Sequence, residues 1–221
     1  MKPAKIETQS ITEQVAEYLA QAIIAGELAG EERIQEQPWA ERLGVSRGSV
    51  REALLVLERR HMVRIEPRKG ARVVALSSRW VTEIAEAWLL ILGDLVRRIP
   101  DRLDAEAEAL MKRRLEAMRK ARAAGDGQAF FDATLDLVET AAELAEHEVL
   151  QRLLAGLMPA VRRCFRFALD NIPQEEDWAM GFAEALVAAV EARDGAEIAR
   201  VLASFGQAEI DRLSSALEQA P

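Results

Sequence analysis

The feature of this sequence that most limits its fold is that the spacing of apolar residues changes from helical to strand-like and then back to helical. Through residues 10–61 the apolar side chains recur at helical spacing. Residues 62–66 and 71–74 instead alternate between apolar and polar, which is typical of half-buried strands, and the turn sequence PRKG joins them. From Ser77 onward only helical patterns remain. The chain is therefore predicted to carry one small hairpin within a mainly helical fold.

Nine helices are predicted from these patterns. Three precede or flank the hairpin, at 10–26, 35–42 and from Ser46 to about His61, and six follow, at about 79–98, 102–124, 127–146, 149–171, 175–193 and 195–218. Two helices joined by a short turn and followed by a hairpin form a winged helix-turn-helix. We expect this domain over residues 1–76 and a C-terminal all-α antiparallel bundle of about six helices over 77–221.

The charge of the chain is unevenly distributed. The formal net charge is −8, but residues 42–72 hold nine basic and three acidic side chains and so carry +6, which leaves −14 on the rest. A basic segment on an acidic protein is the electrostatic footprint of local phosphate binding, although such a run can also be a solvated surface. Charge alone leaves both interpretations open.

The segment that starts the third helix has the chemistry of DNA recognition. Ser46 can cap this helix, and small, polar or arginine side chains follow it. The recognition helix of such a domain meets base edges with its N-terminal residues, and an arginine can donate two hydrogen bonds to guanine. The candidate DNA-binding residues are Gln37, Ser46, Arg47, Gly48, Ser49 and Arg51, together with Arg68, Lys69 and Gly70 of the hairpin tip.

Residues 11–74 resemble the DNA-binding domain of the GntR family. The segment LGVSRGSVREAL, at residues 43–54, is similar to the family signature LGVSRxxVREAL, and VAEYLAQAIIAGEL and EPRKGARVV match in place. The resemblance implies that Arg47 and Arg51 read bases. The chain departs from the family pattern at His61, where a glycine is usual, and at Gln37, where an arginine is frequent.

The C-terminal part is similar to the FCD domains of the FadR-type branch in helix number, length and order, best over residues 115–150. That branch commonly binds a divalent metal through an Asp, a His four residues on and two later His. Counted along the chain, these positions fall at Thr134 and Val138, or at Asp132 and Asp136 in a shifted alignment, and then at Phe182 or Ala183 and at Phe205. Phe and Ala cannot replace imidazole ligands. We therefore expect no metal and no cofactor.

A small-molecule effector is expected inside the helical bundle, where facing helices commonly build pockets. Candidate effector-binding residues are Asp132, Asp136, Arg162, Arg166, Phe182 and Phe205. The two aspartates share a helix face and are either solvated or part of a pocket wall. Arg162 and Arg166 lie beside the apolar stripe of the helix predicted at 149–171. Such an arginine pairs either with an anionic group of a ligand or with an acidic side chain of a neighbouring helix. The six phenylalanines favour an apolar or acyl-type effector.

Three interpretations of function follow. The first is a ligand-responsive repressor that binds a near-palindromic operator in double-stranded DNA as a homodimer. The second is a DNA-binding regulator without an effector, whose helical domain serves dimerisation or protein contacts. The third, an enzyme, finds no phosphate loop, HExxH motif or nucleophile elbow to support it. The lone Cys164, and the lack of an apolar N-terminal signal or of an 18-residue apolar run, lead us to expect a cytoplasmic protein that does not enter a membrane.

Overall fold

The structure is a computed structural model that describes residues 10–67 and 69–219. Contacts within the chain divide it into two compact units, the first ending at Ala75 and the second beginning at Leu76. Arg68, one of the predicted DNA-binding residues, lies outside the described residues.

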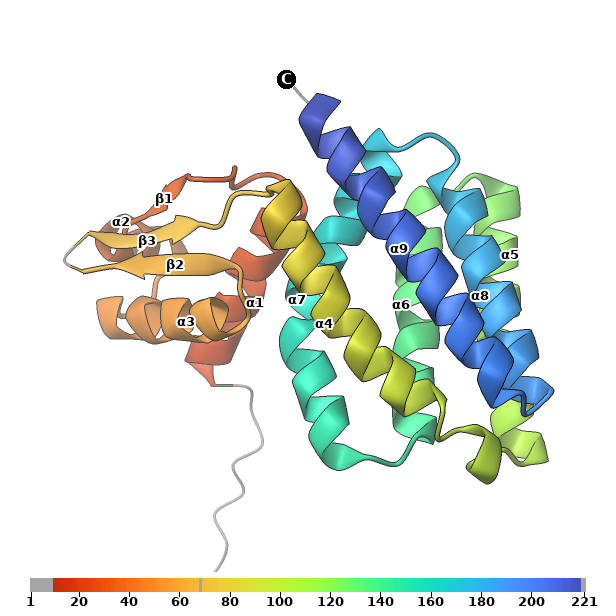
Figure 1. The fold of residues 1–221 in the computed structure, drawn as a ribbon. Helices are drawn as coiled ribbons and strands as arrows, with labels where there is room; N and C mark the ends of the chain where they lie inside the picture. Colours follow the sequence, from red (N-terminus) through yellow and green to blue (C-terminus); the bar gives the residue numbers. More distant parts are fainter. Residues whose placement is uncertain (1–9, 68, 220–221) are drawn as a thin grey trace, which may run out of the picture. The chain divides into compact units, whose positions relative to one another are not determined.

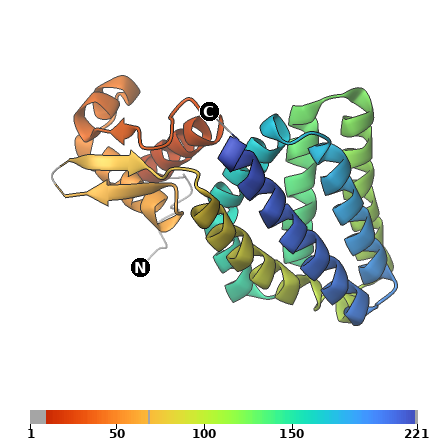
Figure 2. The ribbon, with the colours of Figure 1, turned by 45° about the horizontal axis from the view of Figure 1, so that its top comes forward.

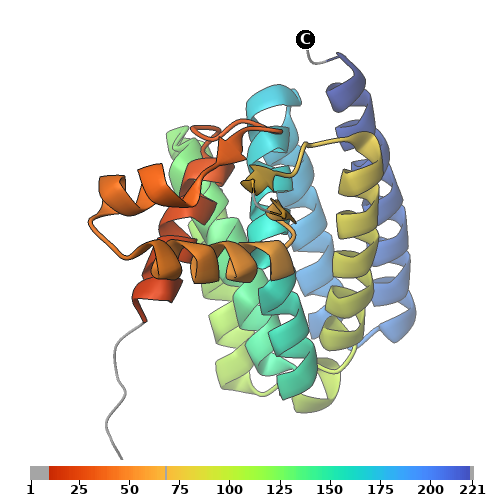
Figure 3. The same ribbon diagram turned by 90° about the vertical axis from the view of Figure 1, so that its left-hand side faces the viewer.

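The N-terminal unit combines three helices and a small sheet (Figure 1). Its elements are α1 (Ile11–Ile24), β1 (Arg33–Ile34), α2 (Glu36–Leu43), α3 (Arg47–Arg59), β2 (Val63–Glu66) and β3 (Gly70–Val73). Helix α1 packs across α3, as Figure 3 also shows. The fully buried Leu19 and Ile23 of α1 and Leu54 and Leu57 of α3 form the centre of this core. Their helical spacing is the pattern from which both helices were predicted.

The sheet has three antiparallel strands in the order β1-β3-β2, whereas the sequence predicted only the two-stranded hairpin. Strand β1 is two residues long, too short to show an alternating pattern, and it exists only because β3 offers it a partner edge. Gly70 is required by this arrangement. Its φ is +86°, and a Cβ at this position would lie 2.5 Å from the backbone oxygen of Ile34.

The C-terminal unit is entirely helical, as predicted (Figure 2). It consists of α4 (Ser78–Val96), the short 3-10 helix Pro100–Arg102, α5 (Ala105–Ala124), α6 (Gly127–Leu144), α7 (Glu148–Asn171), α8 (Glu175–Glu191) and α9 (Gly195–Gln219). Helix α4 packs against α7 and α9, and α8 packs against α5 and α9. The six long helices agree with the six predicted ranges within a few residues at each end.

Side-chain caps explain where most of these helices begin. Ser77 accepts a hydrogen bond from the Trp80 amide at the start of α4, and Asp126 accepts one from Ala129 at the start of α6. His147 caps α7 with its Nδ1 atom, 3.3 Å from the Leu150 amide nitrogen. None of the helices in the described part of the chain is both long and apolar enough to cross a membrane.

Candidate DNA-binding face and bundle cavity

The start of α3 is built by a glycine turn and a serine cap. Gly44 ends α2 in the left-handed conformation with φ +66°, which lets the chain reverse direction within a few residues. Ser46 Oγ then accepts a hydrogen bond from the Ser49 amide at 3.0 Å and lies 2.8 Å from Ser49 Oγ. The first-turn amides and the dipole of α3 favour an anion at this end of the helix.

Arg47 and Arg51 are exposed at the start of α3. Val50, Ala53 and Leu57 are buried, while Arg51 is exposed and the Arg47 side chain is 69% exposed. The Arg47 guanidinium forms an ion pair with Glu36 of α2, with a distance of 2.7 Å from Nε to Oε2. Because this pair is exposed, it is weak, and it can be exchanged for a phosphate or base at small cost.

The other candidate residues of this face lie in two places. Gly48 is exposed beside Arg47, and Gln37 of α2 donates a hydrogen bond to Glu41 on its own helix. In the hairpin, Lys69 is exposed and its amide closes the turn on the Glu66 carbonyl. The start of α3 and the hairpin tip therefore both present cationic groups to solvent.

Several arginines of the basic segment are used inside the N-terminal unit. Arg72 of β3 donates to Glu66 of β2 at 2.9 Å and thereby holds the pKa of that carboxyl below its ordinary value. Arg60 pairs with Glu13 of α1 at 3.1 Å. Part of the positive charge counted in the sequence therefore stabilises the fold, while most of the described basic side chains of this segment, including Arg51 and Lys69, face solvent.

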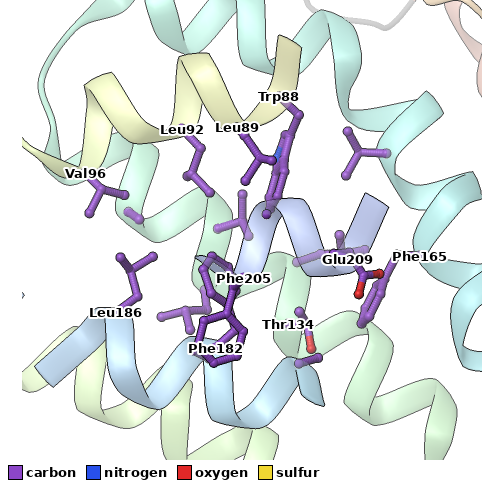
Figure 4. Close-up of a pocket in the computed structure, with 18 of the residues that line it drawn as sticks. Trp88, Leu89, Leu92, Val96, Thr134, Phe165, Phe182, Leu186, Phe205 and Glu209 are labelled. Atoms are coloured by element: carbon purple, nitrogen blue, oxygen red, sulfur yellow. The ribbon is translucent and has the colours of Figure 1, made fainter. Parts of the chain in front are cut away.

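The bundle encloses an apolar cavity of about 170 Å³ (Figure 4). Its lining comes from all six long helices of the bundle, α4 to α9. Phe182 and Phe205 contact each other in its wall, with ring centroids 5.4 Å apart, and Phe205 also contacts the ring of Trp178. An apolar cavity of roughly 150 Å³ in a protein interior can hold a benzene ring. The size and lining therefore suit a small, ring-sized apolar molecule.

One part of the cavity wall is polar. Glu175 of α8 and Glu209 of α9 both line the cavity, and Glu175 is only 3% exposed. Arg212 donates to Glu175 Oε2 at 2.7 Å, and its Nη1 atom lies 3.8 Å from Glu209 Oε2. The guanidinium also stacks over the Trp178 ring, with its carbon 4.5 Å from the ring centroid.

Burial changes the ionisation of this cluster. It raises the pKa of Glu175 to about 8, and the charge of Glu209 adds to the rise while Arg212 opposes it. Burial also raises the pKa of Glu209, against the opposing effect of Arg212. The neighbouring Cys164 thiol, which also lines the cavity, has its pKa raised to about 12 by burial and stays neutral.

Sequence reasoning missed Glu175, Glu209 and Arg212, although a signal was present. Phe205, Glu209 and Leu213 fall at successive i, i+4 positions of the stripe of α9 that faces the core. A carboxylate in such a stripe has to be paired or protonated when it is buried. The partner could not be identified, because Glu175 and Arg212 are 37 residues apart in the chain.

Of the predicted effector-binding residues, the phenylalanines line this cavity and the charged ones do not. Phe182 and Phe205 are part of the lining. The other four lie outside it and pair with neighbouring side chains. Asp132 accepts a hydrogen bond from Gln128, and Asp136 accepts one from Arg114 at 2.9 Å. Arg162 pairs with Glu139 at 2.9 Å, and Arg166 stacks on Phe131 and donates a hydrogen bond to Gln128. A role of these four in effector binding stays a prediction.

The positions at which the FadR-type branch commonly places metal ligands do face the cavity. Thr134, Val138, Phe182 and Phe205 all line it, but they offer a single hydroxyl group and otherwise only hydrocarbon. Within residues 10–67 and 69–219, no three His, Cys, Asp or Glu side chains are arranged to hold a metal ion. The residues present therefore do not fit a divalent metal at this place.

The fold thus defines a winged helix-turn-helix protein with a helical second domain, and comparison with known families agrees. Residues 11–73 match the bacterial regulatory proteins of the gntR family, and residues 83–208, more than half of the chain, match the FCD domain. The chain belongs to the GntR family, in the branch whose members carry an FCD domain.

Individual relatives are more distant. The helix-turn-helix-type transcriptional regulator YdhC of Bacillus subtilis (strain 168) is 30% identical over 108 residues, 49% of this chain and 48% of that protein. The chain thus spans about half the length of this curated relative. The E. coli structure McbR/YncC has a TM-score of 0.76 at 22% identity over 94% of this chain and 99% of that one. A GntR transcriptional regulator from Rhodococcus sp. RHA1 has a TM-score of 0.69 at 22% identity, over 92% of this chain and 99% of that one. These relatives are regulators rather than enzymes, and the two structures share the fold.

Proposed function

We propose that this protein is a sequence-specific DNA-binding transcriptional repressor whose operator affinity is controlled by a small apolar molecule bound in the bundle cavity. The observation that carries the DNA-binding part is the start of α3. A serine-capped helix presents Arg47 and Arg51 to solvent, while Val50, Ala53 and Leu57 of the same helix are buried. This is the arrangement in which a helix enters the major groove with its N-terminal residues against the bases.

The hairpin supports a second contact with DNA. Lys69 is exposed at its tip, next to Gly70, whose missing side chain is already required by the packing against β1. A lysine at such a tip neutralises a phosphate rather than reading a base. We therefore assign base recognition to α3 and backbone contact to the hairpin.

The operator is proposed to be near-palindromic and the protein a homodimer, because symmetric dimers match two-fold DNA sites. Three large apolar side chains support a contact surface on the bundle. Leu90 of α4 is 73% exposed, and Val149 and Leu153 of α7 are 60% and 53% exposed. Helices α4 and α7 pack against each other, so these side chains belong to neighbouring elements.

Control by a ligand is favoured over a purely structural bundle because the bundle contains a cavity of ligand size. Helix α4, which lines the cavity through Trp88 and Leu89, begins three residues after the boundary that follows Ala75. A ligand that changes how α4 packs therefore acts on the segment that continues directly into the DNA-binding unit. It controls DNA binding only if it binds more tightly to one arrangement than to the other.

The test begins with selection of binding sites from random duplex DNA, followed by gel-shift titration of the best site. Arg51→Ala should weaken specific binding by roughly ten- to a hundredfold, because a bidentate arginine–guanine contact is worth about 1–3 kcal/mol. It should leave binding to unrelated DNA nearly unchanged. Arg59→Ala, which removes the same charge at the exposed far end of α3, serves as the matched control. Equal losses for both variants would contradict base recognition by Arg51.

A further inference from the structure

One carboxylate oxygen at the cavity lacks a hydrogen-bond partner in the described part of the chain. Glu209 Oε2 is buried and has no hydrogen-bond partner among the described residues, although Arg212 Nη1 lies 3.8 Å from it. Figure 4 shows Glu209 among the side chains that line the cavity. Nearly all buried polar groups in folded proteins are paired, and an unpaired one is costly. A ligand that donates a hydrogen bond to Glu209 would remove this cost, whereas a pure hydrocarbon would not.

The charges around Glu209 determine whether a cationic or an anionic ligand is favoured. Two carboxylates, Glu175 and Glu209, line the cavity, and the single guanidinium that faces them, Arg212, is not part of the lining. Arg212 is already engaged by Glu175 and by the ring of Trp178. With both carboxylates ionised the cluster carries one negative charge, so it repels a ligand carboxylate and attracts a ligand cation.

The remainder of the cavity determines the shape of the ligand. Its other lining groups are almost all hydrocarbon or aromatic, and they include the contacting rings of Phe182 and Phe205. The volume of about 170 Å³ suits one ring with a short substituent rather than a long acyl chain. A ligand ring can pack against the aromatic side chains of the wall while a cation at the end of a short alkyl substituent reaches Glu209.

We propose that the effector is a ring-sized apolar amine whose ammonium group donates to Glu209. This inference rests on the proposed function for the existence of an effector, and it replaces the acyl-type effector that the sequence favours. The ammonium would pair with Glu209, and the ring would pack against Phe182 and Phe205. Recognition is by one charge-assisted hydrogen bond in an otherwise apolar site.

Binding of an amine should release a proton. Glu175 and Glu209 are close enough to disfavour full ionisation of both, and the other titratable or charged groups near them are Arg212 of α9 and Cys164 and Arg163 of α7. An added cation favours the ionised form of both carboxylates, so the shared proton leaves. The affinity for the amine should therefore rise between pH 6 and pH 8.

The experiment compares three ligands of one shape: phenethylamine, phenethyl alcohol and hydrocinnamate. Binding to the full chain is measured by calorimetry and by tryptophan fluorescence, since Trp88 and Trp178 line the cavity. Phenethylamine should bind most tightly, phenethyl alcohol more weakly and hydrocinnamate least. Glu209→Gln should weaken phenethylamine by about ten- to a hundredfold. It should affect the alcohol much less, and Glu218→Gln, at an exposed site of the same helix, should change neither.

The proposal is overturned if hydrocinnamate binds as tightly as phenethylamine, if none of the three binds at millimolar concentration, or if Glu209→Gln keeps full amine affinity. Circular dichroism and operator affinity of Glu209→Gln establish that the variant is folded. Failure of the proposed function has a different signature. If phenethylamine binds as expected but leaves operator affinity unchanged, the ligand class stands and the control of DNA binding does not.

Discussion

The buried carboxyl of Glu175 should make the stability of the protein depend on pH in an unusual direction. Its pKa is raised from an ordinary value of 4.5 to about 8, mainly by burial, so the folded chain holds a proton that the unfolded chain has lost. Stability rises with pH only where the unfolded state binds more protons, and here the folded state binds more. The contribution of Glu175 is therefore fully present below pH 4.5 and is lost progressively as pH rises to about 8.

The size of the effect follows from the shift. A shift of one pKa unit corresponds to about 1.4 kcal/mol, which sets an upper limit on the slope per pH unit. Glu175 shares its proton with Glu209 and keeps an ion pair with Arg212, which reduces the total. We expect the free energy of unfolding to fall by about 2 to 4 kcal/mol between pH 5 and pH 8 through this group.

Glu175→Gln isolates this contribution, because glutamine has the shape of a protonated glutamate but does not titrate. Its carbonyl can still accept the hydrogen bond that Arg212 donates at 2.7 Å. The variant should match the wild type near pH 5 and exceed it in stability by about 2 to 4 kcal/mol near pH 8. Urea unfolding at one fixed protein concentration, followed by tryptophan fluorescence, measures the difference, and three of the four tryptophans lie in the C-terminal unit.

Glu143→Gln, at an exposed position of α6, is the control and should run parallel to the wild type at every pH. Other groups of the protein also titrate in this range, so only the difference between wild type and variant is informative. Parallel curves for wild type and Glu175→Gln from pH 5 to pH 8 would refute the assignment of a proton to this buried carboxyl.

Three further predictions concern the N-terminal unit. His61 is held at φ +59°, so His61→Gly should stabilise the protein by about 1 kcal/mol in urea unfolding, and a loss of stability would contradict backbone strain at this position. Gly70→Ala should destabilise by about 1–3 kcal/mol or more, because its Cβ would meet the Ile34 carbonyl; an unchanged midpoint would show that β1 can move away freely. Lys69→Ala should weaken binding to all duplex DNA about equally and lower the slope of affinity against salt by roughly one ion, whereas a loss confined to the selected operator would indicate base reading by Lys69.

The departure from the family pattern at His61 has a structural meaning that the sequence alone could not supply. The resemblance to the GntR family marks this position as one where glycine is usual. The structure shows why, since the residue after α3 takes a left-handed conformation that glycine adopts without strain. A histidine there is tolerated because the tertiary contacts on either side, including the buried Met62, hold the turn in place.

The sequence by itself determined the elements and their order. Helical spacing, the capping residue Ser46 and the PRKG turn are local signals, and each acts within one or two turns of the chain. The DNA-recognition segment was readable for the same reason, because one short helix start contains it. The long helices of the bundle agree with their predicted ranges because each carries a continuous apolar stripe.

Tertiary structure decided everything that depends on partners distant in the chain. Strand β1 forms only against β3, and the fixed place of Gly70 follows from that pairing. The cavity draws its walls from six helices, and its acidic end from Glu175 and Glu209 on two of them. Sequence periodicity tells which side of a helix is buried, but not which side chains meet there or what space they leave, because those depend on how separate helices pack.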